Sequence, residues 1–144
     1  MFKMIRMKRL LQLFIVPAII FGIGSCSDKG GGGGGGGGDE ANLAVTLNPP
    51  AGSTQPAAPQ IDFPLTVSIT STMPPQGVTI DVKAAPDGST TNFYTETKSA
   101  TSSITPFTIT NTPTGVVCVA TVTVTSKTKP ANTWTGSFRY TRKP

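Results

Sequence analysis

Residues 116–125 read Val-Val-Cys-Val-Ala-Thr-Val-Thr-Val-Thr, and this stretch decides the fold. Apolar side chains occupy every second position from Cys118 to Val124, and threonines fill the positions between them towards the end. Because successive side chains of a strand point to opposite faces, this pattern predicts a β-strand with one buried face. The turn-forming sequence Asn-Thr-Pro-Thr-Gly at 111–115 introduces the strand, which we expect to lie centrally in a sheet.

The same alternation recurs on both sides of this stretch. Further strands are predicted at residues 43–47, 63–70, 78–83, 92–98, 104–110 and 133–141. Turn sequences rich in Pro, Gly, Asn and Asp separate them. The patterns at 92–98 and 104–110 are weaker. In the first, Phe93 or Tyr94 points inward, and in the second, Pro106 marks an edge or a bulge.

About seven short strands and no sustained helical spacing predict an all-β fold. Abundant Thr and Val, with Pro and Gly in the breaks, disfavour helices. We therefore expect residues 41–144 to form a single antiparallel β-sandwich, in which two sheets pack face to face. A small β-barrel is the alternative.

The first 25 residues have the layout of an export signal. A cationic head at residues 1–9 precedes an apolar run at residues 10–23. As a helix, this run would rise only about 21 Å, short of the roughly 30 Å of a hydrocarbon core, so a permanent span is disfavoured. We expect residues 1–25 to be a signal peptide that is cleaved.

The end of this segment, Ile23-Gly24-Ser25-Cys26, resembles the bacterial lipobox. That motif has an aliphatic residue three positions before the cut, then two small residues, then cysteine. The resemblance implies that the signal peptidase recognises Ile23, Gly24 and Ser25, and that the Cys26 thiol takes up diacylglycerol. The lipid bilayer is then a partner of the chain. An ordinary signal peptide with an incidental Cys26 is the alternative.

Residues 26–40 form a spacer between the lipid site and the predicted domain. Asp28 and Lys29 are followed by an unbroken run of glycines from Gly30 to Gly38. Such a run cannot pack a core, and we expect a disordered tether with an average span of about 17 Å. A phosphate-binding loop is excluded, because the strand, helix and Lys-Ser/Thr pair of that motif are missing.

The basic net charge belongs to the export signal. Twelve basic and seven acidic residues give a formal charge of +5, but four of the basic residues lie within residues 1–9. The eight that remain oppose all seven acidic residues, which leaves +1. The sequence therefore offers no electrostatic case for a nucleic-acid partner.

Two family resemblances follow from these features. The lipobox, glycine spacer and Thr-rich domain are similar to lipoproteins of the Bacteroidota type. This implies a lipid-anchored location in the cell envelope, at the outer membrane, with the periplasmic or surface side left open. The strand spacing over residues 41–144 resembles immunoglobulin-like (Ig-like) or fibronectin type III domains. The chain departs from antibody domains because it has no intersheet cysteine pair and its one tryptophan, Trp134, lies in the last predicted strand.

The residue types of common catalytic sites are scarce. The chain has no histidine, which excludes Ser-His-Asp hydrolysis and the usual zinc sites, so no metal and no cofactor is expected. Once Cys26 is lipidated, Cys118 has no partner and is predicted to be a buried hydrophobe. Asp81 and Glu96 would suit glycoside hydrolysis only if their carboxyl groups meet, and solvated positions are favoured for both. Asp87-Gly88-Ser89 is predicted to be a turn.

Aromatic side chains remain as candidates for ligand contact. Trp134, Phe138 and Tyr140 share one face of the last predicted strand, and Tyr94 could lie nearby. If that face is exposed, Trp134, Tyr140 and Tyr94 would suit contact with a sugar or a peptide. If it points inward, the rings are core residues, which the intervening Thr, Ser and Arg favour.

Together, these features predict a membrane-anchored, non-catalytic binding or adhesion module for a glycan or a protein ligand. The alternative is a structural or accessory subunit of a cell-envelope complex. Such a subunit would pair with an envelope protein through an exposed strand edge. An enzyme is not expected.

Overall fold

The computed structural model describes residues 40–144. The predictions for the signal peptide, for Ile23, Gly24, Ser25 and Cys26, and for the glycine tether lie outside these residues. The described part of the chain contains seven strands: β1 (Val45–Asn48), β2 (Phe63–Ile69), β3 (Val78–Pro86), β4 (Tyr94–Ala100), β5 (Ile104–Ile109), β6 (Val117–Ser126) and β7 (Thr133–Thr141).

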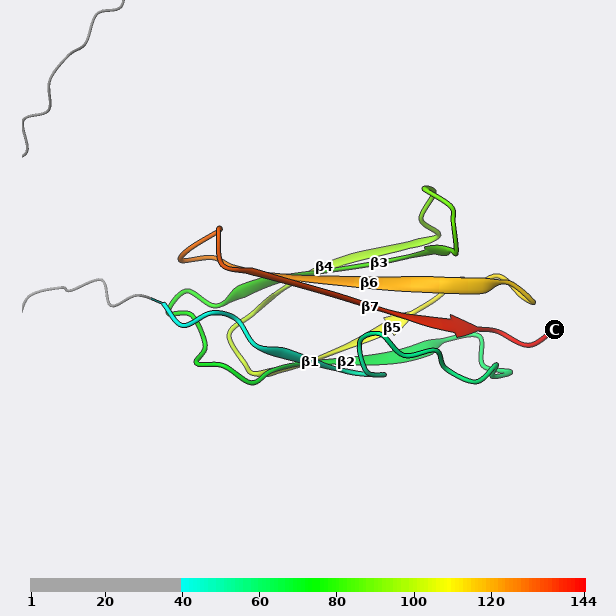
Figure 1. The fold of residues 1–144 in the computed structure, drawn as a ribbon, viewed down its shortest axis with the longest axis horizontal. Helices are drawn as coiled ribbons and strands as arrows, with labels where there is room; N and C mark the ends of the chain where they lie inside the picture. Colours follow the sequence, from blue (N-terminus) through cyan, green and yellow to red (C-terminus); the bar gives the residue numbers. More distant parts are fainter. Residues whose placement is uncertain (1–39) are drawn as a thin grey trace, which may run out of the picture. The chain divides into compact units, whose positions relative to one another are not determined.

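The strands form two antiparallel sheets that pack as a sandwich (Figure 1). One sheet has the order β1-β2-β5 and the other the order β4-β3-β6-β7. The predicted all-β sandwich is confirmed, and the alternative of a closed barrel is wrong, because each sheet keeps two edge strands.

The core lies between the two sheets and follows from the alternation in the sequence. In β6, the side chains of Cys118, Val122 and Val124 are fully buried, and the threonines between them lie on the outer face. The largest fully buried side chains are Tyr140, Phe138, Leu65, Ile80 and Ile109. Each fully buried side chain of the size of Val, Leu or Phe contributes about 1.5–3 kcal/mol. Because every strand contributes to this core, residues 40–144 have what a domain needs to fold alone.

The two weaker strand predictions also correspond to strands. β4 points Tyr94, Glu96 and Lys98 to its inner face, and Phe93 just before it packs against the core. β5 is an edge strand of its sheet, so Pro106 lies at an edge.

The connection after β1 covers the outer edge of β7. Thr54 and Ala58 form parallel bridges with Arg139 and Arg142. The backbone N–H of Gln55 donates to the carbonyl of Arg139 at 2.8 Å. Sequence alternation did not predict this pairing, because the segment contains small and polar residues with no apolar period.

The chain enters the domain at an anchor formed by Glu40, Ser126 and Asn132, which we call the entry anchor. The side-chain amide of Asn132 donates to Glu40 Oε1 at 2.6 Å and to the Ala41 carbonyl at 2.9 Å. Its Oδ1 accepts the backbone N–H of Leu43 at 2.9 Å. Ser126 Oγ donates to Glu40 Oε2 at 2.9 Å. Asn132 and Ser126 are buried, so the end of β6 and the β6–β7 connection together hold the start of the domain.

Asn132→Ala should destabilise the domain by about 1–3 kcal/mol, because the Leu43 N–H loses its acceptor in a buried place. Urea unfolding measures this loss, and hydrogen exchange should show faster exchange of the Leu43 amide. Asn92→Ala is the matched control, since Asn92 is exposed and its loss should change stability by less than about 0.5 kcal/mol. Equal stability of the two variants would contradict the role of the entry anchor.

Candidate functional site

The aromatic residues predicted to contact a ligand do not come together on one surface. Tyr140 and Phe138 are each 1% exposed and form a core cluster with Phe63. Burial raises the pKa of Tyr140 to about 12. Trp134 is half-buried, and its ring lies over Gly136, where it leaves no room for a Cβ. Tyr94 is also half-buried, but it lies on β4, at the opposite edge of the four-stranded sheet from β7.

Cys118 is a free, fully buried residue, which confirms the prediction of a core position. Burial raises the pKa of its thiol, so the thiolate form is disfavoured. Its Sγ lies 3.6 Å from the carbonyl of Val116. A buried thiol with a raised pKa is a poor nucleophile.

Asp81 and Glu96 lie on opposite faces of the four-stranded sheet. Asp81 pairs in register with Thr97, and the Thr97 hydroxyl donates to its carboxylate on the outer face. Glu96 is the neighbour of Thr97 in β4 and therefore points to the inner face. The two carboxylates do not form the pair that glycoside hydrolysis needs.

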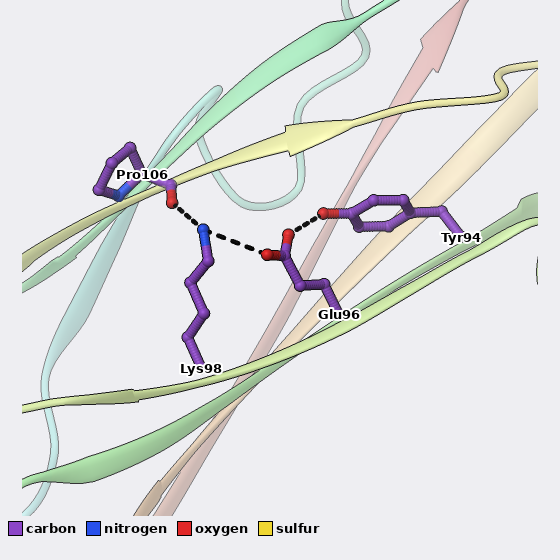
Figure 2. A network of polar contacts seen from close by, with 4 residues as sticks. All are labelled: Tyr94, Glu96, Lys98 and Pro106. Atoms are coloured by element: carbon purple, nitrogen blue, oxygen red, sulfur yellow. Dashed lines mark hydrogen bonds and ion pairs between the residues drawn. The ribbon is translucent and has the colours of Figure 1, made fainter.

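A polar cluster lies where β4 and β5 approach each other across the open side of the sandwich (Figure 2). We call Tyr94, Glu96, Lys98 and Pro106 the edge cluster. The Tyr94 hydroxyl donates to Glu96 Oε2, and Lys98 Nζ lies 3.3 Å from Glu96 Oε1. Lys98 Nζ also donates to the carbonyl of Pro106 at 2.8 Å. The ammonium lies 4.3 Å from the centre of the Phe107 ring, in range for a cation–π contact.

The electrostatics of the edge cluster keep the Glu96 carboxyl group ionised and the Tyr94 hydroxyl group protonated near pH 7. The hydrogen bond from Tyr94 lowers the pKa of Glu96, partial burial opposes this effect, and Lys98 lowers it further. Burial, followed by the hydrogen bond and the charge of Glu96, raises the pKa of Tyr94. Glu96 is thus an anion and Tyr94 a neutral phenol near pH 7. Neither group has the pKa near 7 that suits a general acid or base.

The contribution of Glu96 to the stability of the domain should disappear in acid. Its folded-state pKa is below the ordinary value of 4.5, so its stabilising contribution is complete above that pH. The contribution is lost as the pH falls through the lowered pKa. Glu96→Gln should therefore be less stable than the wild type near neutral pH, and the difference should shrink in acid.

Urea unfolding at a series of pH values between about 7 and 2 measures this difference. Thr95→Ala, on the outer face of the same strand, controls for general disturbance of β4. A difference between Glu96→Gln and the wild type that stays constant over this range would contradict the assignment.

A shallow hollow of about 370 Å³ lies on the outer face of the four-stranded sheet, beside the β3–β4 connection. It is lined by Lys83, Ala85, Pro86, Asp87, Gly88, Ser89, Asn92, Val119 and Thr121. Ala85 and Val119 are paired neighbours in β3 and β6, and they supply apolar surface. The side chains of Lys83, Asn92 and Thr121 add an ammonium, an amide and a hydroxyl group. The hollow thus combines apolar surface with hydrogen-bonding groups, as ligand sites do.

The charge of the hollow comes from Lys83. The predicted turn at Asp87-Gly88-Ser89 is present, and the Ser89 N–H donates to the Pro86 carbonyl at 2.9 Å. Asp87 pairs with Arg139 at 3.0 Å, and both side chains are largely exposed, so the pair contributes less than about 1 kcal/mol. Within residues 40–144, Lys83 forms no ion pair. With Asp87 paired, Lys83 leaves a net positive charge for a ligand.

The hollow and the entry anchor lie at opposite ends of β6. Val119 lines the hollow, and Ser126 belongs to the entry anchor. At about 3.3 Å per residue, these two positions are roughly 23 Å apart along the strand. The β3–β4 connection thus lies at the end where β7 finishes, away from the point at which the chain enters (Figure 1).

Sequence reasoning did not identify Lys83, Asn92 or Lys98 as members of a cluster. Each is a polar residue in a strand or turn, and the sequence pattern alone predicts only that its side chain is solvated. The pairing of Lys83 with Thr121 places hydroxyl and ammonium groups together, and only the sheet order shows this.

The comparisons assign no family. The chain matches no model of a known protein family, no curated protein and no solved structure. Among residues 40–144, no helix is long and apolar enough to cross a membrane. The same residues contain no group of three or more His, Cys, Asp or Glu side chains that could hold a metal ion.

Proposed function

We propose that this chain is a lipid-anchored protein of the cell envelope that presents a non-catalytic binding module to a glycan or a protein. The hollow beside the β3–β4 connection is the proposed contact surface. The observation that carries the proposal is the position of this hollow, at the end of β6 remote from the entry anchor. A domain tethered at one end can turn its other end towards a ligand.

The anchor part of the proposal rests on the N-terminal sequence. A cationic head, a short apolar run and Ile23-Gly24-Ser25-Cys26 support cleavage before Cys26 and lipidation of its thiol. Several acyl chains would hold the chain stably, whereas one gives marginal binding. The outer membrane is the proposed location, as in lipoproteins of the Bacteroidota type.

The Ig-like part of the proposal rests on the order of the strands. Seven strands divide into sheets of three and four, and the chain changes sheets after β2, after β4 and after β5. Such crossings between two antiparallel sheets support an Ig-like or fibronectin type III-like topology. The domain would belong to the variants that lack the intersheet disulfide, since Cys118 is free.

Mass spectrometry of the mature chain, isolated from bacterial membranes, tests the anchor. We expect an N-terminal Cys26 that carries diacylglycerol and an added acyl chain. Cys26→Ser should release the protein from the membrane fraction. An unmodified Cys26, or an intact signal segment in the mature chain, would overturn this part.

Glycan and peptide arrays probed with residues 40–144 test the binding module. We expect a ligand whose affinity falls at least about tenfold in Lys83→Ala and Asn92→Ala, which corresponds to about 1.4 kcal/mol. Lys129→Ala is the matched control, because Lys129 is exposed on the β6–β7 connection near the entry anchor. If both Lys83→Ala and Asn92→Ala retain full binding, the hollow is not the binding site. The absence of any ligand for the folded domain would count against a binding function.

A further inference from the structure

The two strands that line the open side of the sandwich, β4 and β5, are both edge strands. An edge strand presents unpaired backbone groups, to which another chain can add a strand. The outer edge of β7 is covered by residues 52–58, and β1 is short and is followed by Pro49 and Pro50. The edges of β4 and β5 lack such protection. If strand addition is prevented at these edges, side chains must prevent it.

Pro106 interrupts the edge of β5. Thr66 of β2 is its partner in register, and β5 has no strand on its other side. Proline has no N–H to donate, and its carbonyl already accepts a hydrogen bond from Lys98 Nζ at 2.8 Å. An incoming strand would thus find no donor at the middle of β5 and would compete with an ammonium for the acceptor.

The inner face of β4 is charged, although it points between the sheets. Glu96 and Lys98 keep 36% and 37% of their side chains exposed, because they lie at the open side of the sandwich. A strand added next to β4 would extend the sheet over these charges and remove their water. Burial of a charge without full compensation is costly, so this arrangement disfavours addition.

We propose that the edge cluster is a device against strand addition, and that it keeps copies of this chain from pairing through β4 and β5. Lys98 has the central role, because it contacts Glu96 in its own strand and the Pro106 carbonyl in the opposite sheet. The proposal does not depend on the lipid anchor. It disfavours an accessory subunit that pairs with its partner through this edge.

The double variant Lys98→Val and Pro106→Thr of residues 40–144 tests the proposal. It removes the charge and restores an edge N–H, and both new residues favour strands. Sedimentation velocity should show a monomer for the wild type and a roughly twofold rise in mean mass, towards a dimer, for the variant at high concentration. Lys83→Val is the matched control, because it makes the same replacement in β3, which has a strand on each side, and it should remain a monomer.

Hydrogen exchange locates the contact. The associated double variant should protect the amides of Ile104 and Thr108 in β5, which flank Pro106, by at least about tenfold relative to the diluted monomer. Association without protection of β4 or β5 would overturn the proposal, and so would a folded double variant that remains monomeric. If the double variant does not fold, Pro106→Thr alone supplies the test, since Pro106 is exposed; it should associate more weakly, and a strictly monomeric Pro106→Thr would overturn the proposal.

Discussion

Gly77→Ala is expected to destabilise the domain by about 3–5 kcal/mol, in the range of the most severe single substitutions. Gly77 has a φ of +76°, which costs a residue with a side chain about 1–2 kcal/mol. A Cβ at this position would also overlap the carbonyl oxygen of Ala100. Ala100 pairs with Val78 in the β3–β4 ladder, so its carbonyl cannot move without disturbing that pairing.

Urea unfolding of Gly77→Ala and Gly88→Ala separates the two costs. Gly88 has a φ of +82°, but a Cβ there would meet nothing within 4 Å. Gly88→Ala should therefore lose only the backbone cost of about 1–2 kcal/mol. Equal losses in the two variants would show that the overlap with Ala100 has no consequence.

Phe138→Ala should have a comparable effect, a loss of about 3–5 kcal/mol. Phe138 is 1% exposed, and its ring centre lies 5.9 Å from that of Phe63 and 5.8 Å from that of Tyr140. Phe63 comes from the three-stranded sheet and Phe138 from the four-stranded sheet. The substitution would leave a cavity between the two layers that neither sheet can fill alone.

Thermal and urea unfolding measure the effect of Phe138→Ala, with Ile104→Ala as the control. Ile104 is also a large apolar residue, but it is 61% exposed, and its loss should change stability by less than about 0.5 kcal/mol. A Phe138→Ala variant as stable as Ile104→Ala would contradict the position of the core.

The two proposals are experimentally independent. Variants of Lys83 and Asn92 probe the hollow on the outer face, whereas variants of Lys98 and Pro106 probe the edge cluster at the open side. A domain that binds a ligand but associates freely in the wild type would support the hollow and not the edge cluster. A monomeric domain with no ligand would support the edge cluster and not the hollow.

The strands could be predicted well because alternation is a local property. In β6, the alternation of apolar and polar residues alone indicates that Val122 enters the core and Thr123 does not. The same reasoning holds for β2 and β3. The pairing of residues 52–58 with β7 could not be predicted, since it depends on backbone hydrogen bonds and not on apolar side chains.

The candidate site could be predicted only in part. The turn at Asp87-Gly88-Ser89 was evident from its composition, but the hollow beside it requires β3 and β6 to be neighbours. The sequence favours an inward position for the face of Trp134, and in the structure Trp134, Phe138 and Tyr140 all lie on the inner face of β7. Tyr140 is buried in the core, whereas Trp134 is half-buried, packs against the core and lies over Gly136 near the start of β7.

By itself, the sequence determined the strand content, the buried face of the strands with clear alternation, such as β2, β3 and β6, and the absence of histidine chemistry. Only the tertiary structure decided which polar side chains meet. Glu96 and Lys98 point inward because β4 must turn Ala100 towards the core, and they remain hydrated because β4 is an edge strand. Period-two geometry is encoded residue by residue, whereas position in a sheet depends on pairing between segments far apart in the chain.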